Sequence, residues 1–270
     1  MIAGMGLIPA GDAAGKVMGA EMGVDPFFIA WSRFALGGLL LAPLIRFNEF
    51  KFSLLVDWRI IFRALLIVAG IASIQTALIT SSLATVFGAF FVGPIVAYFG
   101  AAVFLKEPIS LVRTFMLGVG FIGVLMVVKP GFGMEPGTGF ALLAGLFYGG
   151  FLVANRWLSH AANPKDMLFS QLVIGSVALL PMGLNALPQV SWQISGLVLA
   201  SAAFSLLGNL FLILALRRAG TSRLAPFVYF QLFFVVLLGY FIFDDLPGFV
   251  TLLGLMIILV SGFLSYFARN

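Results

Sequence analysis

The sequence predicts an all-α polytopic membrane protein with ten transmembrane helices, arranged as two inverted five-helix repeats. Composition is the first observation: 62% of the 270 residues are hydrophobic and only 9% are charged, whereas soluble domains carry about 25% charged residues. The apolar residues also gather into runs close to the roughly 20 residues of helix that cross a bilayer. Finally, short motifs of the first half return in the second half at a constant shift.

Ten apolar segments follow one another with short polar connections. They cover about 1–19, 27–45, 60–79, 84–105, 111–129, 137–158, 167–186, 193–216, 224–243 and 249–267. Each is expected to be helical, because a spanning segment must satisfy its own backbone hydrogen bonds. Continuous apolar runs exclude a barrel, whose strands alternate apolar and polar residues. Pro94 and Pro226 predict separate bends in the fourth and ninth segments, and Asp12 and Lys16 in the first segment argue against a cleavable signal peptide.

The distribution of basic residues predicts the orientation. Apart from Lys16, Lys129 and Arg33, the basic residues follow the even-numbered segments: Arg46, Lys51, Arg59, Arg63, Lys106, Arg113, Arg156, Lys165, Arg217, Arg218, Arg223 and Arg269. Cytoplasmic loops are enriched in Lys and Arg, so both termini are expected in the cytoplasm and the protein in the inner (cytoplasmic) membrane. The net charge of +5 therefore does not require a nucleic-acid partner.

An internal repeat appears when each position i is compared with position i + 138, and such self-similarity indicates a duplicated unit. The matched positions are Asp25-Pro26 with Asn163-Pro164, Ser32-Arg33 with Ser170-Gln171, Gly37 with Gly175, Pro43 with Pro181, Gly70 with Gly208, and Glu107 with Asp245. Because each copy would hold five helices, the second would enter the membrane from the opposite face. Inverted repeats of this kind are typical of transporters.

Three charged residues fall within the first two segments. Asp12 and Lys16 lie four residues apart on one helical face, and Arg33 lies in the next segment. Charges inside a bilayer are usually paired or face water, so an ion pair of Asp12 with Arg33 or Lys16, a substrate contact and proton coupling are all open. Proton coupling would require the Asp12 carboxyl to take up a proton, which a neighbouring base opposes.

The other candidate residues are neutral and polar. Gln75, Thr76, Tyr148, Asn155, Asn209, Tyr229 and Gln231 lie within or beside the segments, where they could join helices by hydrogen bonds or line a ligand cavity. As candidate substrate-binding residues we select Asp12, Gln75, Tyr148, Asn209, Tyr229 and Gln231. Glycines 11, 15, 19 and 23 form a stripe of small residues suited to close helix packing, static or sliding.

Enzyme chemistry has few candidate groups in this chain. There is no cysteine, and the single histidine, His160, falls in a loop. Intramembrane catalysis needs a nucleophile with a base, or a metal with its ligands, and no phosphate-binding GxxxxGK[ST] motif is present. We therefore expect no enzyme activity, no metal, no cofactor and no direct use of ATP.

Several short motifs together resemble the EamA family of the drug/metabolite transporter superfamily. They are Gly11-Asp12-Ala13-Ala14-Gly15-Lys16, Ser32-Arg33-Phe34, Leu105-Lys106-Glu107-Pro108, Gly120-Phe121-Ile122-Gly123-Val124, Lys129-Pro130-Gly131, Ala225-Pro226-Phe227-Val228-Tyr229-Phe230-Gln231, and the hinge from Phe243 to Pro247 with Gly254. The resemblance implies two units, 1–130 and 138–268, whose segments 1–4 and 6–9 enclose a central cavity. The hinge of the second unit departs from the family pattern, with Asp244-Asp245 in place of a Glu.

The resemblance also implies a function. We expect a secondary transporter or facilitator that moves a small metabolite, an amino acid or a related polar or aromatic compound, by alternating access. A non-transporting scaffold or channel-like subunit and a membrane-embedded enzyme are the alternatives. The expected partners are a small-molecule substrate, the lipid bilayer and, as a candidate coupling ion, a proton, in a monomer or homodimer. Nothing in the residues selects the substrate or the direction of transport.

Overall fold

Helices form all the regular secondary structure in the described part of the chain, residues 2–131, 133–218 and 230–267 of a computed structural model. The first half contains α1 (Ile2–Lys16), a π-helical turn η1 (Val17–Glu21), α2 (Pro26–Leu41), α3 (Trp58–Thr80), α4 (Leu83–Phe90), α5 (Val92–Leu105) and α6 (Leu111–Val128). The second half contains α7 (Thr138–Trp157), α8 (Pro164–Asn185), α9 (Trp192–Arg218), α11 (Phe230–Phe243) and α12 (Phe249–Phe267). Two 3-10 turns, Ala42–Leu44 and Phe52–Leu55, lie between α2 and α3.

The helices make this a multi-pass membrane protein. Within the described residues, seven candidate spans are long and apolar enough to cross a bilayer: Pro26–Leu44, Trp58–Thr80, Leu83–Leu105, Leu111–Val128, Thr138–Trp157, Pro164–Asn185 and Trp192–Phe211. Two further apolar helices, Phe230–Phe243 and Phe249–Leu264, are shorter. The total of ten spans stays a prediction. Large apolar side chains on the outer surface, such as Phe104 and Leu111, suit contact with lipid.

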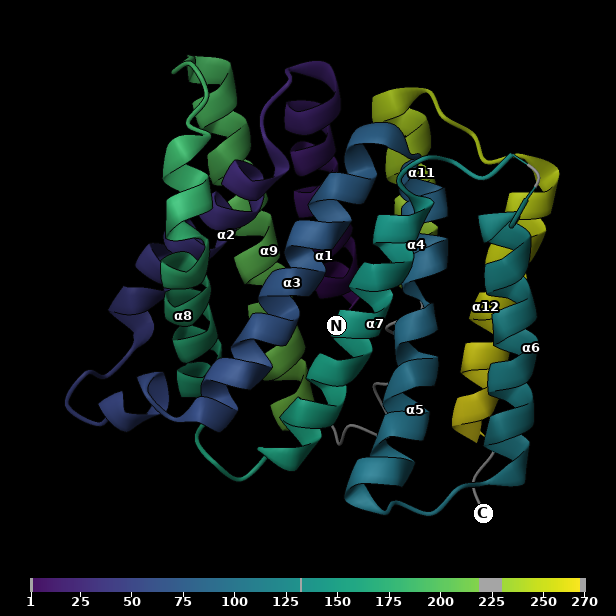
Figure 1. Cartoon of the computed structure of the whole chain (residues 1–270), viewed down its shortest axis with the longest axis horizontal. Coiled ribbons are helices and arrows are strands. Elements are labelled where there is room, and N and C mark those ends of the chain that lie inside the picture. The colour runs from purple at the N-terminus through teal and green to yellow at the C-terminus, as the bar shows by residue number, and fades with distance from the viewer. Residues whose placement is uncertain (1, 132, 219–229, 268–270) are drawn as a thin grey trace.

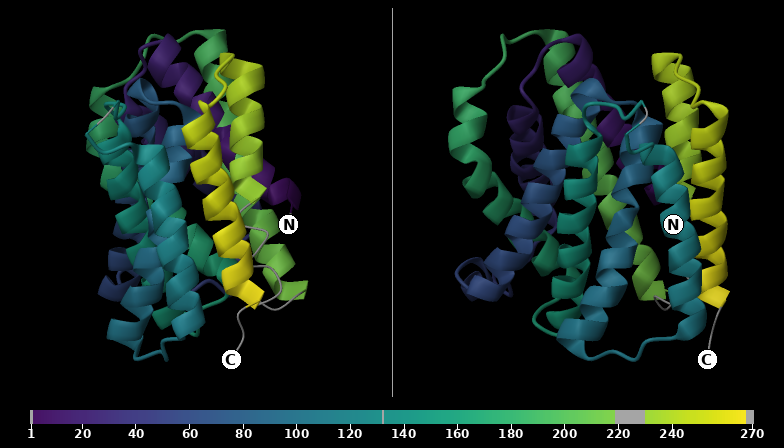
Figure 2. Two further views of the ribbon diagram at one scale, coloured as in Figure 1. Left: turned by 90° about the vertical axis from the view of Figure 1, so that its right-hand side faces the viewer. Right: turned by 45° about the vertical axis from the view of Figure 1, so that its right-hand side comes forward.

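The helices pack mainly in pairs that join the two halves of the chain. α1 packs against α9, α2 against α8, α3 against α7, and α6 against α12, while α5 also contacts α7 and α11 contacts α1. Figure 1 shows α2 and α8 at one end of the long axis and α6 and α12 at the other. The views in Figure 2 show α6 and α12 lying side by side.

The connections gather at the two ends of the helix bundle. The loops after α1, α3, α6, α8 and α11 lie at one end, at the top of Figure 1, which we call the Lys16 end. The loops after α2, α5 and α7 lie at the opposite end, which we call the Arg156 end. The basic residues of the first half therefore concentrate at the Arg156 end.

The bend predicted at Pro94 is confirmed. The predicted segment 84–105 divides at Phe91 into α4 and α5. Pro94 has no N–H to donate to the carbonyl of Phe90 four residues earlier, and its ring crowds that carbonyl. Pro226 lies outside the described residues.

The α2–α8 pair shows the same packing at positions that the internal repeat matches. A Cβ added to Gly37 would lie 3.2 Å from the Leu172 side chain, and a Cβ added to Gly175 would overlap the ring of Phe34. Gly37 and Gly175 are one matched pair of positions, and Phe34 and Leu172 are another. Each glycine lets a large side chain of the opposite helix approach its backbone.

The α6–α12 pair repeats this arrangement. A Cβ on Gly120 would lie 2.8 Å from the Ser261 hydroxyl oxygen, and one on Gly123 would lie 2.9 Å from the Ile258 side chain. The shift of 138 residues relates Gly120 to Ile258 and Gly123 to Ser261. Each of the two contacts therefore maps onto the other. Small residues allow helices in a membrane to pack at short distance.

The hinges before α6 and α12 also match. Lys106 and Asp244, related by the same shift, both adopt the left-handed conformation at the end of their helix, with φ of 55° and 50°. The next residue in each case donates its backbone N–H into the preceding helix, Glu107 to Ala101 O (3.3 Å) and Asp245 to Gly239 O (3.1 Å). Such bonds satisfy carbonyls that a helix end would otherwise leave open.

Candidate functional site

A buried ion pair joins α1 and α2. Arg33 Nη1 donates to Asp12 Oδ1, and the two residues are only 5% and 4% exposed. The predicted Asp12–Arg33 pair is thus confirmed, whereas Lys16 donates instead to the backbone carbonyl of Ser81. The opposite charges cancel, which lowers the cost of burying them inside a bilayer.

Two more helices complete this cluster. Gln75 Nε2 of α3 donates to Asp12 Oδ1 at 2.9 Å, and Arg33 Nη2 donates to the hydroxyl of Ser205 in α9 at 3.0 Å. Gly15 makes room for Gln75, because any Cβ at this position would overlap the Gln75 amide oxygen. That oxygen and Arg33 Nε are buried without a hydrogen-bond partner among the described residues. The cluster therefore keeps one donor and one acceptor that could still form hydrogen bonds.

A small cavity lies beside this cluster, between α2, α3, α8 and α9. Its volume is about 30 Å³, room for roughly one or two water molecules. It is lined by Arg33, Phe34, Gly37, Ile71, Leu168, Gln171, Leu172, Ser205, Leu206 and Asn209. Ile71 and Ser205 lie near the middle of α3 and α9, so the cavity is close to the midplane of the bundle.

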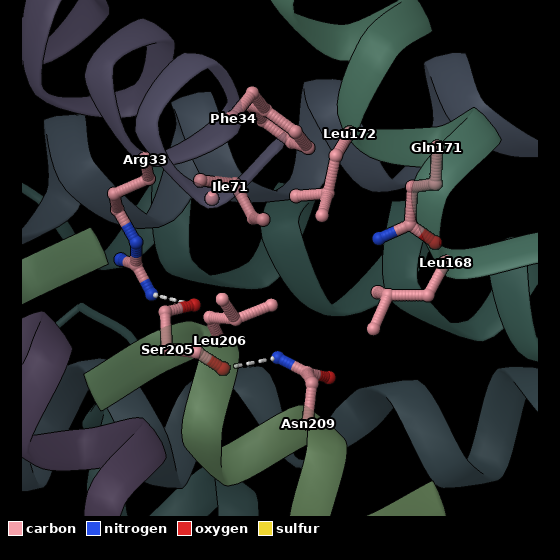
Figure 3. Close-up of a pocket in the computed structure, with 10 residues that line it drawn as sticks. Arg33, Phe34, Ile71, Leu168, Gln171, Leu172, Ser205, Leu206 and Asn209 are labelled. Carbon is pink, nitrogen blue, oxygen red and sulfur yellow. Dashed lines mark hydrogen bonds between the residues drawn. The ribbon is translucent and has the colours of Figure 1, made fainter. Parts of the chain in front are cut away.

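The polar groups of the cavity come from both halves of the chain. Figure 3 shows Arg33 and Gln171 entering from opposite sides, with the amide nitrogen of Gln171 turned toward the space between them. Asn209 donates to the backbone carbonyl of Ser205 at 2.8 Å, which leaves its own amide oxygen without a hydrogen bond from the described residues. Apolar walls with a few convergent polar groups are the usual form of a ligand site.

A second polar cluster lies on the Arg156 side of the cavity. Arg63, predicted among the loop cations, lies in the second turn of α3 and is only 4% exposed. Its Nε donates to Asn155 Oδ1, Nη1 to the carbonyl of Met167 (3.3 Å) and Nη2 to Gln171 Oε1 (3.0 Å). Gln171 thus connects this cluster to the cavity.

The Lys16 end is closed by a hydrogen-bond network around α4. Glu135, in the loop after α6, accepts from the backbone N–H of Ser82 (2.6 Å) and from the hydroxyl of Thr85 (2.6 Å). The carboxylate therefore sits at the N-terminus of α4, where the helix dipole favours negative charge. The backbone N–H of Gly137 donates to the Ser81 hydroxyl at 2.9 Å.

The Arg156 end carries a different contact. Arg156 donates to Glu107 at 2.6 Å in an exposed ion pair between the end of α7 and the hinge after α5. Near the start of α3, hydrogen bonds from Arg59 hold the pKa of the Asp57 carboxyl below its usual value. His160 is exposed, and no group of three possible metal ligands occurs within residues 2–131, 133–218 and 230–267.

The predicted substrate-binding residues divide into three groups. Asp12, Gln75 and Asn209 belong to the connected network around Arg33 and Ser205. Elsewhere, Tyr148 packs against Phe90 and Phe151 with ring centroids 4.8 and 6.1 Å apart, and Gln231 Nε2 lies 3.5 Å from the sulfur of Met5. Tyr229 lies outside the described residues.

Sequence reasoning passed over three residues of the site. Nothing in the sequence marks Ser205 as a site residue, because serines are common in transmembrane helices. Gln171 could have been identified, since it matches Arg33 in the internal repeat. Arg63 lies inside the predicted segment 60–79, so its position already indicates a buried cation.

Comparison with known proteins places the chain among membrane transporters. The model of a family described as the EamA-like transporter family matches residues 11–129 and 135–267. An S-adenosylmethionine uptake transporter of Rickettsia conorii is 27% identical over 93% of this chain and 85% of its own. The Pseudopaline exporter CntI of Pseudomonas aeruginosa is 30% identical over 60% of this chain and 58% of its own. One crystal structure shares the fold, with a TM-score of 0.68 at 14% identity over 96% of this chain and 93% of that one.

Proposed function

Because this chain belongs to the EamA-like transporter family, we propose that it is a secondary transporter or facilitator of a small metabolite in the cytoplasmic membrane. The relatives are named transporters and exporters, in agreement with the prediction that the chain is not an enzyme. One relative is named for uptake and another for export, so family membership leaves the direction open.

The observation that carries this proposal is the polar cavity near the midplane. Arg33 and Ile71 of the first half line it together with Gln171, Ser205 and Asn209 of the second half, and Gln171 lies opposite Arg33. Transporters with inverted repeats bind their substrate near the bilayer midplane, where the repeats meet. The buried Arg33 Nε beside this cavity has no hydrogen-bond partner among the described residues, and because an unpartnered buried polar group is costly, it supports a role in binding a ligand.

The size of the cavity indicates how transport would proceed. About 30 Å³ is far below the roughly 300–1,000 Å³ of a metabolite site. Binding would therefore require α2 and α3 to separate from α8 and α9, which enlarges the space between the halves. Alternate separation at the Lys16 end and at the Arg156 end would give alternating access.

Two inverted repeats, 1–130 and 138–268, are part of this proposal. The exchanged contacts of α2 with α8 and of α6 with α12, and the matching left-handed hinges at Lys106 and Asp244, support it. They occur at the same shift that relates the sequence motifs. Ten spans, with both termini in the cytoplasm, follow from such repeats and from the positive-inside rule.

The orientation has a direct test, because the natural chain contains no cysteine. Ser159→Cys places a single thiol at the Arg156 end, and Met134→Cys places one at the Lys16 end; both residues are exposed. A membrane-impermeant maleimide added to intact cells should label the thiol at position 134 and not the one at position 159. Labelling of both or only the second would contradict the orientation.

For the substrate contacts we propose the residues that meet at the cavity. Asn209, with Arg33 and Ser205, would contact the compound directly, and Asp12 and Gln75 would hold the Arg33 guanidinium in position. Tyr148, Gln231 and Tyr229 stay predicted substrate-binding residues. The Asp12–Arg33 pair uses the carboxylate in its ionised form, which favours exchange or facilitated diffusion over proton coupling.

The test of the function is transport by the purified protein in proteoliposomes. Vesicles preloaded with an unlabelled metabolite extract of the host cells are given a radiolabelled mixture of amino acids and related compounds. A carrier shows uptake that saturates and that the internal compounds accelerate. Flux that rises linearly with concentration would indicate a channel, and the lack of flux for every fraction of the extract would contradict the proposal.

A further inference from the structure

We propose that Arg63 binds an anionic group, a carboxylate or a phosphate, of the transported compound. The inference rests on the proposed transport function and adds the chemical class of the substrate. Arg63 does not line the cavity in this structure, but it donates to Gln171, which does, on the side that leads to the Arg156 end. It thereby extends the site beyond the Arg33 cluster.

Arg63 is a buried cation without a counter-ion. Its hydrogen bonds go to two amide oxygens and a backbone carbonyl, and its guanidinium lies 4.9 Å from the centroid of the Phe151 ring. The ion pairs of the described residues involve Asp12, Glu49, Asp57 and Glu107. All ten acidic residues of the chain lie in the described part, and none of them forms an ion pair with Arg63.

Arg33 and Arg63 differ in their counter-ion. Each is about 95% buried between helices, but Arg33 faces Asp12 whereas Arg63 faces neutral oxygens. Neutral acceptors reduce the cost of burying the charge but leave a net charge of one unit inside the bundle. An anion on the substrate would cancel that charge through charge-assisted hydrogen bonds, which are roughly twice as strong as neutral ones.

Gln171 connects this cation to the cavity. Its Oε1 accepts from Arg63 Nη2 at 3.0 Å, while its Nε2 is turned toward the cavity and makes no hydrogen bond to the described residues. The amide oxygen occupies the place that one oxygen of a carboxylate or phosphate would take. Rotation of Gln171 would free Nη2 of Arg63 for such an oxygen, and the planar guanidinium matches both kinds of anion.

A purely structural role for Arg63 makes a different prediction about stabilisation by anions. If Arg63 only clamps α3 to α7 and α8 through its hydrogen bonds, Arg63→Met lowers the melting temperature, and added anions shift the wild type and the variant alike. If its charge is kept for a ligand, added carboxylate or phosphate compounds raise the melting temperature of the wild type and not that of Arg63→Met. Gln171→Glu supplies a permanent carboxylate and should raise the melting temperature while it removes binding of external anions.

The experiment uses the full chain with Arg63→Met, Gln171→Glu and, as a control, Arg59→Met. Arg59 carries the same charge one turn earlier but is exposed and paired with Asp57. Melting temperature is read from tryptophan fluorescence in detergent. Uptake by proteoliposomes is measured with compounds that differ only in the anionic group: phenylalanine and phenethylamine, tyrosine and tyramine, glycerol phosphate and glycerol.

Preference for the anionic member of a pair by the wild type and the control supports the inference. In Arg63→Met the apparent affinity for that member should fall by about 30-fold or more, as for the loss of one partner of a buried charge pair. The inference would be overturned by an equal shift of the melting temperature with anions in the wild type and in Arg63→Met, by a Gln171→Glu variant less stable than the wild type, or by equal uptake of both members of every pair. Saturable exchange of the members that lack the anionic group, with the same apparent affinity for both members of each pair in the wild type and in Arg63→Met, would overturn the anion site and leave transport intact. If anions stabilise the wild type but not Arg63→Met and no compound is exchanged, the anion site stands and the proposed transport function is overturned.

Discussion

The Asp12–Arg33 pair allows a quantitative prediction about stability. Arg33→Met keeps much of the side-chain volume but leaves the Asp12 carboxylate, 4% exposed, with the 2.9 Å hydrogen bond from Gln75 as its remaining side-chain contact. Loss of one partner from a buried ion pair costs about 3–5 kcal/mol. The variant also loses the hydrogen bond to Ser205, which in a membrane contributes below about 2 kcal/mol. We expect the free energy of unfolding to fall by about 3–5 kcal/mol.

A double-mutant cycle separates the ion pair from its surroundings. In Asp12→Asn/Arg33→Met neither side chain is charged, and the amide introduced at position 12 can still accept the hydrogen bond from Gln75. The double variant should therefore be more stable than Arg33→Met, with a coupling energy of about 2–4 kcal/mol. Stability is measured by reversible unfolding with SDS from mild detergent micelles, followed by tryptophan fluorescence. A loss below about 1 kcal/mol in Arg33→Met, or a double variant as unstable as the single one, would refute the reasoning that the pair is buried and dry.

Three further predictions concern the packing and the ends of the bundle. Gly15→Ala should displace the Gln75 amide, lower the free energy of unfolding by about 1–3 kcal/mol and slow transport, whereas the same change at the exposed Gly139, where a Cβ would meet nothing within 4 Å, should leave both unchanged. Glu135→Gln should lower the free energy of unfolding by about 1 kcal/mol, because the N-terminus of α4 loses a negative charge; an unchanged SDS midpoint would contradict this. Gly123→Leu should separate α6 from α12, since even a Cβ would lie 2.7 Å from the carbonyl oxygen of Gly254, and the SDS midpoint should fall in this variant but not in Gly118→Leu, which faces open space.

Much of the fold follows from local rules in the sequence. Helix starts at Pro26 and Pro164 agree with the Asp-Pro and Asn-Pro motifs, because Pro is favoured in the first turn and the residue before it is pushed out of the helical region. The bend near Pro94 follows from the missing N–H. The π-helical turn at Val17–Glu21 was not predicted, since no residue pattern in this stretch requires it.

The candidate site was only partly predictable, because side-chain partners depend on how helices rotate against each other. Four-residue spacing brings Asp12 and Lys16 to one face of α1, yet Lys16 contacts Ser81 and Asp12 contacts Arg33. Distant pairs such as Arg33 with Ser205 depend on α9 packing beside α2. Apolar periodicity does not fix such contacts, since lipid surrounds the bundle and nearly every face of these helices is apolar.

The two halves match at several backbone positions, such as the hinges at Lys106 and Asp244, but differ in charge at the proposed site. Arg33 and Gln171 occupy matched positions on α2 and α8, and the preceding serines, also matched by the repeat, bond alike, Ser32 to the carbonyl of Ile29 and Ser170 to that of Met167. The cation of the second cluster, Arg63, comes instead from α3. A bundle with equal charges at both positions would repel itself across the cavity. Arg33, toward the Lys16 end, is neutralised by Asp12, whereas Arg63, toward the Arg156 end, has no counter-ion. An anionic group in the cavity would therefore be attracted toward Arg63. A compound that carries both an anion and a neutral polar group would then bind in one orientation, with the neutral group at Asn209 and Ser205.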